Sequence, residues 1–233
     1  MRKPRALDLF CCAGGAGMGL HRAGFEVVGV DIRPQPNYPF EFHQADALTY
    51  PLDGFDFIWA SPPCQAHTAL KVMKNARKHE DLIPQTRAKL EASGLPYVME
   101  NVFGAPLLPD RTFMLCGTMF GLASGDGDLR RHRYFETNMA IPLTPECNHA
   151  RPKTIGIYGS KVRDIALEKR HYSKDKATRG APVGVVLPKE VGFEAMDIHW
   201  MSQAELSQAI PPAYSEFIGR AAIDHLESMR AAA

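Results

Sequence analysis

The first residue that could do chemistry is Cys64, which follows two prolines in the stretch SPPCQ (61–65), directly after an apolar run at 55–61. Most free cysteines only fill small gaps in an apolar core. A thiolate is also a soft nucleophile, and prolines restrict the backbone on which it would be held. Cys64 is therefore either a core residue or a nucleophile, and its neighbours in the fold have to decide which.

An acid and two arginines lie at the ends of other apolar runs. Glu100 belongs to MENV (99–102), and Arg131 and Arg133 belong to RRHRYF (130–135). Because the carboxyl ends of parallel strands meet at one edge of a sheet, these side chains can converge with Cys64 on one crevice. Taken singly, Glu100 could be a capping or salt-bridge acid, and the arginines a solvated surface run. Only their common position indicates a catalytic site.

The glycine-rich stretch at 11–19 lies between an apolar run and a helix-like segment. Glycines at such a turn let the backbone approach a ligand beside the partly positive end of a helix. They fall at 14, 15, 17 and 19, which fits neither G-x-G-x-x-G nor a phosphate-binding loop. Asp31 ends the next strand, where an acid binds ribose hydroxyls, and Asp46 could accept from an adenine amino group. The pattern favours an adenosine-type cofactor without phosphates.

The elements that must position these residues alternate along the chain. Apolar runs predict strands at 5–10, 25–31, 55–61, 96–102, 112–117 and 131–137, and helical patterns lie between and after them, at 80–94 and 213–232. The alternation predicts an α/β fold with a largely parallel sheet covered on both faces. We expect a catalytic and cofactor-binding body at 1–140, a small basic insert at 141–199, and C-terminal helices at 200–233 that pack back on the body.

Composition narrows the class of protein. The chain has 233 residues, a net charge of +1, and no apolar run near the roughly 18 residues that a membrane span requires. A strand-like run begins too close to the first residue to leave room for a secretory signal. The five cysteines are irregularly spaced, which predicts free thiols in a reducing cytoplasm.

Positive charge is concentrated in the insert. Between 151 and 179, nine Lys or Arg stand against three acids, so this segment carries +6 and the rest of the chain −5. Such a patch favours a polyanion such as nucleic acid, although a charged run is often only a solvated loop. Cys116, His132, Cys147 and His149 are of types that bind zinc, but their spacing is that of neither a finger nor a ribbon, and we expect no metal.

Together the motifs resemble those of the DNA cytosine-5 methyltransferases, in the same order and over nearly the whole chain. DLFCCAGGAGMGLHRAGF (8–25) is similar to the family's S-adenosylmethionine-binding motif, SPPCQ to its nucleophile motif, and ENV (100–102) to its base-holding motif. RRHRYF is similar to its Arg motif, and AIPPAYSEFIG (209–219) to its C-terminal motif. The resemblance implies the Rossmann-like S-adenosylmethionine-dependent methyltransferase fold, with a mostly parallel sheet, one antiparallel strand and a small irregular insert.

The resemblance also implies a mechanism. Cys64 adds to carbon 6 of a cytosine flipped out of double-stranded DNA, which makes carbon 5 nucleophilic enough to take a methyl group. Glu100, if protonated, hydrogen-bonds ring nitrogen 3, and Arg133 reaches oxygen 2. Arg131 helps to hold the thiolate or a phosphate, and Asn101 fixes the loop that carries the cysteine.

The same resemblance implies two sets of binding residues. S-adenosyl-L-methionine is expected to contact Phe10, Gly14, Gly15, Asp31, Ile32, Asp46, Ala47, Pro63, Gln208 and Ala209. The DNA substrate is expected to contact Ser61, Gln65, Lys71, Lys74 and Arg163, with 65–79 as a basic loop that closes over the base.

The chain departs from the family pattern at several positions. Cys12 replaces a glycine, Leu129 a glutamine, and Ser207 and Gln208 a Gly-Asn pair. The segment at 140–199 replaces a long target-recognition domain, so we expect a short or degenerate recognition sequence, or help from a partner.

Three alternatives stay open at this stage. The tRNA-methylating branch of the family shares the cysteine and the glutamate, a variant enzyme could transfer a modified methyl group, and a binding protein could retain the fold without turnover. We expect a monomer without membrane association in a bacterial or phage-infected cytoplasm. An accompanying restriction endonuclease cannot be inferred.

Overall fold

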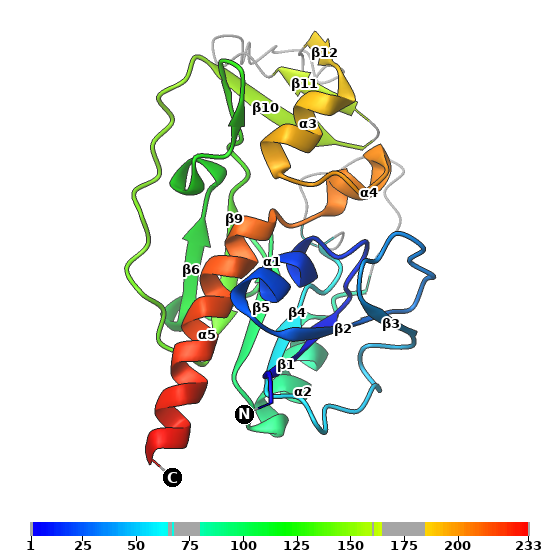
Figure 1. Ribbon diagram of the computed structural model, residues 1–233, viewed down its shortest axis with the longest axis vertical. Coiled ribbons are helices and arrows are strands. Elements are labelled where there is room, and N and C mark those ends of the chain that lie inside the picture. Colours follow the sequence, from blue (N-terminus) through cyan, green and yellow to red (C-terminus); the bar gives the residue numbers. More distant parts are fainter. Residues whose placement is uncertain (1, 65–66, 68–79, 160, 165–184, 233) are drawn as a thin grey trace. The chain divides into compact units, whose positions relative to one another are not determined.

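The computed structural model describes residues 2–64, 67, 80–159, 161–164 and 185–232 (Figure 1). The chain divides into two compact units: unit 1 comprises 1–115, 132–144 and 209–233, and unit 2 comprises 116–131 and 145–208. This division differs from the expected one, because 116–131 and 200–208 belong to unit 2 rather than to the body. The reason is long-range pairing, which local periodicity does not contain: the strand at 127–128 pairs with the one at 153–158.

Unit 1 is built on a seven-stranded sheet in the order β3-β2-β1-β4-β5-β9-β6. Its strands are β1 (Arg5–Leu9), β2 (Glu26–Asp31), β3 (Glu41–Gln44), β4 (Phe57–Ala60), β5 (Tyr97–Asn101), β6 (Thr112–Leu115) and β9 (Arg133–Thr137). β1 to β5 pair in parallel, and β9 runs antiparallel to both β5 and β6. The expected mostly parallel sheet with one antiparallel strand is confirmed.

The two faces of this sheet bury different sets of side chains. Alternate strand residues, such as Leu7, Val28 and Ile58, pack in one cluster with Ile83 and Leu90 of α2 (Ile83–Ser93). The apolar residues between them face the opposite side of the sheet, because side chains alternate along a strand. On that face Trp59 meets Phe135, and Phe135 meets Tyr214 of α5 (Pro212–Ala232).

Helix α1 (Gly15–Ala23) packs against α5 through glycines. A Cβ added at Gly19 would lie 2.1 Å from the Pro212 carbonyl oxygen, and one at Gly219 would lie 2.8 Å from the Ala23 Cβ. These contacts hold the middle and the end of α1 against the C-terminal helix (Figure 1). Pro84 lies in the first turn of α2, where its missing N–H costs no hydrogen bond.

Unit 2 contains more regular structure than the irregular insert that the sequence predicts. Its sheet has the order β12-β11-β10-β8-β7. The elements are β7 (Ala123–Ser124), β8 (Gly127–Asp128), β10 (Lys153–Tyr158), β11 (Lys161–Asp164), β12 (Val185–Leu187), α3 (Lys189–Met196) and α4 (Gln203–Gln208), with the short helix η4 (Gly117–Phe120). α3 covers the sheet closely, because a Cβ at Gly192 would lie 2.6 Å from Val162 Cγ2. The strands are short and their partners distant in sequence, which is why periodicity missed them.

No helix within the described residues is both long and apolar enough to cross a membrane.

Candidate active site

The loop that carries Cys64 continues directly from β4. The Ser61 N–H donates to the Leu9 carbonyl oxygen at 3.1 Å, which extends the pairing with β1, and the Ser61 hydroxyl accepts from Trp59 Nε1 at 2.9 Å. Pro62 is buried, while the side chain of Cys64 is partly exposed. A cysteine that only filled a core gap would be buried, so its exposure favours a chemical role.

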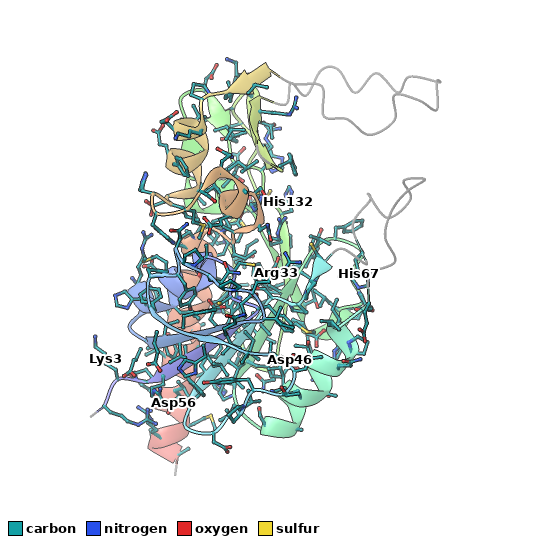
Figure 2. The ribbon with its side chains drawn as sticks, turned by 90° about the vertical axis from the view of Figure 1, so that its right-hand side faces the viewer. Lys3, Arg33, Asp46, Asp56, His67 and His132 are labelled. Carbon is teal, nitrogen blue, oxygen red and sulfur yellow. The ribbon has the colours of Figure 1, made fainter. Side chains whose placement is uncertain are left out.

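The backbone around Cys64 is held from both sides. Asn101, itself fully buried, donates from Nδ2 to the Pro62 carbonyl oxygen at 3.0 Å, and its Oδ1 accepts the Val102 N–H at 2.9 Å. On the other side, the His67 N–H donates to the Cys64 carbonyl oxygen at 2.8 Å. The His67 ring (labelled in Figure 2) lies 2.9 Å from an Asp81 carboxylate oxygen.

Glu100 and Arg133 meet at the same edge of the sheet. Glu100 is near the carboxyl end of β5, and Arg133 begins β9, which runs antiparallel and so starts where β5 ends. Arg133 Nε lies 3.1 Å from Glu100 Oε1, with the two side chains 19% and 9% exposed. Arg133 Nη1 also donates to the His132 carbonyl oxygen at 2.9 Å. The acid and the arginine are thus a partly buried ion pair beside Asn101.

Arg131 takes a different position from Arg133, although only one residue separates them. It belongs to unit 2, where its guanidinium donates to the carbonyl oxygens of Ser207 at 2.8 Å and Ile157 at 3.4 Å. These contacts give Arg131 a role in holding unit 2 together. Its contact with the thiolate or a phosphate stays a prediction.

The glycine-rich turn adopts left-handed backbone at several residues. Phe10 and Cys12 have φ of 58° and 45°, and Gly14 has φ of 83°. Cys12 therefore occupies a conformation that favours glycine, which explains why a glycine would be the ordinary residue there. Its N–H donates to Asp31 Oδ2 at 3.0 Å. Burial, together with the nearby acids, raises the pKa of the Cys12 thiol to about 12, so this cysteine is protonated at neutral pH.

Side chains on the glycines of this turn would collide with neighbouring parts of unit 1. A Cβ at Gly14 would lie 2.8 Å from Pro39 Cδ, and one at Gly15 would lie 2.4 Å from the Ile210 carbonyl oxygen and 3.2 Å from the Ala209 Cβ. Ala209 is thus buried against the turn. A close-packed backbone at the start of a helix suits a ligand that is bound through peptide groups.

Asp31 is the last residue of β2, and Asp46 (labelled in Figure 2) lies just beyond the end of β3. Asp31 accepts the N–H of Cys12 and, at 2.9 Å, that of Arg33. Each carboxylate oxygen has a further lone pair, so Asp31 can still accept from ribose hydroxyls. Asp46 Oδ1 accepts the Leu48 N–H at 2.9 Å. The residues present therefore fit the adenosine part of a nucleoside cofactor.

Asp8 and Tyr38 form a buried pair beside the glycine-rich turn that the sequence pattern did not indicate. Asp8 is buried in β1, and its Oδ2 accepts from the Tyr38 hydroxyl at 3.2 Å, while a backbone hydrogen bond joins it to Gly17. Burial raises the pKa of the Asp8 carboxyl well above its ordinary value, and it also raises the pKa of Tyr38. An acid inside an apolar run just before a glycine-rich turn was the available signal.

The remaining predicted contacts are distributed as follows. Ile32 is 68% exposed after β2, Ala47 is buried, and Pro63 is exposed beside Cys64. Gln208 and Arg163 belong to unit 2. Gln65, Lys71 and Lys74, with most of the expected basic loop and much of the basic segment at 151–179, lie outside the described residues.

Three solved structures that superimpose on nearly the whole chain are methyltransferases by name. A proposed DNA modification methyltransferase encoded within an Escherichia coli prophage superimposes with a TM-score of 0.61 at 14% identity, over 97% of this chain and 99% of that one. The Schizosaccharomyces pombe Dnmt2 methyltransferase and the Entamoeba histolytica methyltransferase EhMeth both give a TM-score of 0.58 with the same coverage, at 12% and 11% identity. The chain therefore has the Rossmann-like methyltransferase fold.

Sequence comparison adds no relative to these structural neighbours. No protein-family model matches the sequence, and no curated protein matches it.

Proposed function

We propose that this protein transfers a methyl group from S-adenosyl-L-methionine to carbon 5 of a cytosine in DNA, through a covalent adduct with Cys64. The observation that carries the proposal is the arrangement at the end of β5. Asn101 Nδ2 donates to the Pro62 oxygen of the Cys64 loop at 3.0 Å, and the adjacent Glu100 is paired with Arg133 at 3.1 Å. A thiol, an acid and a cation from three neighbouring strands would thus be available for catalysis at one edge of the sheet. The likeness in fold to methyltransferases supports the same conclusion.

The chemistry needs these residue types. Carbon 5 of cytosine is too electron-poor to attack a methyl donor by itself. Addition of the Cys64 thiolate to carbon 6 puts electron density on carbon 5, and a thiolate is also a good leaving group when the adduct collapses. After methyl transfer, a base removes the proton from carbon 5 and the bond between Cys64 and carbon 6 breaks.

Glu100 and Arg133 would bind the base during the addition. The two side chains pair with each other, and in the sheet β5 lies between β9 and β4, the strand that leads into the Cys64 loop. Glu100 would take up a proton and donate to ring nitrogen 3, which neutralises charge that develops on the ring. Arg133 would donate to oxygen 2.

The glycine-rich turn would bind the methyl donor. S-adenosylmethionine supplies an electrophilic methyl group on sulfur. Gly14 and Gly15 would let backbone amides approach it, and Asp31 would accept from the ribose hydroxyls. Asp8 accepts a hydrogen bond from Tyr38 and would support the turn in this way.

The target cytosine would have to be flipped out of the duplex, because carbon 6 is out of reach while the base is stacked.

A methyl-transfer assay tests this proposal. Labelled S-adenosylmethionine is incubated with duplex DNA or with stem-loop RNA, and the digested nucleosides are separated. We expect label in 5-methylcytosine from DNA, loss of transfer in Cys64→Ala and Glu100→Gln, and normal transfer in Glu91→Gln, an exposed-acid control. Label in RNA alone would move the substrate to RNA. Label on a cytosine nitrogen, or binding without transfer to either polymer, would overturn the proposal.

A further inference from the structure

Three metal-binding side chains of unit 2 come together from distant parts of the sequence. Cys116 precedes η4, whereas Cys147 and His149 lie in the segment that leads into β10. Their ligand atoms, the two Sγ and one ring nitrogen, all lie within 4.8 Å of one another. Cysteine and histidine are the usual ligands of zinc in proteins.

The distances are close to those of a tetrahedral zinc site. His149 Nε2 lies 3.0 Å from Cys147 Sγ and 3.4 Å from Cys116 Sγ. Around tetrahedral zinc, with Zn–S of about 2.3 Å and Zn–N of about 2.0–2.1 Å, a sulfur and a nitrogen ligand lie about 3.6 Å apart. One ring nitrogen therefore faces both sulfurs at nearly the separation that a shared ion would set.

The surroundings of Cys116 suit a thiolate ligand. The cysteine is fully buried, and the Thr118 hydroxyl donates to its sulfur at 3.3 Å. The same hydroxyl lies 3.8 Å from Cys147 Sγ. Hydrogen bonds from the protein to coordinating groups are a regular feature of metal sites, because they fix the orientation of the ligands.

The segment that carries Cys147 and His149 has no regular secondary structure of its own. The stretch 138–152, between β9 and β10, contains no helix or strand, and connections of this length without structure of their own are uncommon in compact domains. Leu143 within it is 99% exposed, so apolar burial does not hold it there. Near its end, Arg130 donates to the Arg151 carbonyl oxygen at 2.6 Å, which fixes the backbone beside His149.

We propose that Cys116, Cys147 and His149 bind a structural zinc ion. All three ligands belong to unit 2, and one further donor would complete the tetrahedral set. The proposal replaces the sequence-based expectation of no metal: the spacing matches no zinc finger because the ligands are gathered by tertiary structure. Binding would release the two thiol protons and tie the start of the basic segment to η4. It is independent of methyl transfer.

Metal content of the tag-free protein, purified after expression with added Zn²⁺, tests the site. We expect about one zinc per chain in the wild type, as for a closed structural site, and a loss of at least about fivefold in Cys147→Ser and His149→Ala. These ligands are more exposed than Cys116, so the variants are expected to fold. His199→Ala, an exposed histidine of unit 2, and Cys64→Ala should both retain the zinc.

Two further measurements separate the alternatives. Cobalt(II) added to the zinc-free protein should give the visible spectrum of a tetrahedral thiolate site, and chelator should lower the melting temperature of the wild type but not that of Cys147→Ser. All five cysteines should titrate as thiols in the denatured, metal-free protein. The proposal would be overturned if the wild-type protein contained no more zinc than the variants. A thiol count lowered by two, which would indicate a disulfide, would also overturn it.

Discussion

Replacement of Asn101 by alanine should separate the positioning of Cys64 from overall stability. The amide makes two hydrogen bonds to backbone, at 3.0 Å to the Pro62 oxygen and 2.9 Å from the Val102 N–H, and it is fully buried. A buried backbone group left without a partner costs about 1–3 kcal/mol. Because Val102 is only partly buried and its N–H can reach water, only the Pro62 oxygen is left without a partner, and we expect Asn101→Ala to lower the free energy of unfolding by about 1–3 kcal/mol.

The catalytic effect should exceed what the loss of folded protein explains. Release of the Pro62 oxygen frees the backbone two residues before the nucleophile, and a displacement of about 1 Å can reduce a rate about 10²-fold. Single-turnover methyl transfer, measured at saturating cofactor where the variant is folded, should fall by about 10–100-fold. The dissociation constant for S-adenosylmethionine should stay within about twofold of the wild type, a difference below 0.5 kcal/mol.

Asn138→Ala is the matched control. Its side chain bonds backbone at the opposite end of β5, accepting the Tyr97 N–H and donating to the Leu95 oxygen, both at 2.9 Å. Asn138 is exposed, so its loss should cost only about 0.5–1.5 kcal/mol and leave the rate unchanged. Urea unfolding and single-turnover rates check both variants. A wild-type rate in folded Asn101→Ala, or an equal slowing in Asn138→Ala, would refute the positioning role of Asn101.

Three further outcomes follow from buried contacts of unit 1. Glu136 is fully buried and paired with Arg87 at 2.7 Å, so Arg87→Ala should cost about 3–5 kcal/mol in urea unfolding, and a loss below about 1 kcal/mol would contradict a buried pair. Burial raises the pKa of the Asp8 carboxyl, so the native protein keeps a proton there that the unfolded chain releases above about pH 4. The contribution of Asp8 to the free energy of unfolding therefore falls as the pH rises. The stability of Asp8→Asn relative to wild type should therefore increase from pH 4 to 8, and a constant difference would contradict this assignment. Gly15→Ala would put a Cβ 2.4 Å from the Ile210 oxygen and so displace the turn. Binding of S-adenosylmethionine, measured by equilibrium dialysis, should then weaken by at least about tenfold, and unchanged binding would contradict a cofactor site at the turn.

The edge of the sheet could be predicted from sequence because its information is local. Each motif directly follows an apolar run, and parallel strands bring their carboxyl ends together. This logic gave the positions of Glu100, Asp31 and the Cys64 loop in unit 1. Arg133 reaches the same edge for a different reason, because β9 runs antiparallel and begins where β5 ends.

Residues fixed by tertiary structure could not be predicted in this way. Arg131 was grouped with Arg133, but the chain passes between the units there and its guanidinium bonds carbonyls of unit 2. β8 and β10 pair across a long sequence separation, so neither has a local signal of its partner. Cys116 and Cys147 likewise come together only through folding.

Covalent trapping of DNA on the protein shows whether Cys64 is the nucleophile. The protein is incubated with S-adenosylmethionine and duplex DNA that contains 5-fluorocytosine. Because fluorine replaces the carbon 5 proton that a base would remove, the enzyme cannot be released from the base. The adduct is then digested and mapped by mass spectrometry. We expect a stable DNA adduct on the peptide that contains Cys64. The trapped base should carry the methyl group, and the Cys64→Ala variant should form no adduct. An adduct on a different cysteine, or methylated DNA with no adduct at all, would contradict it.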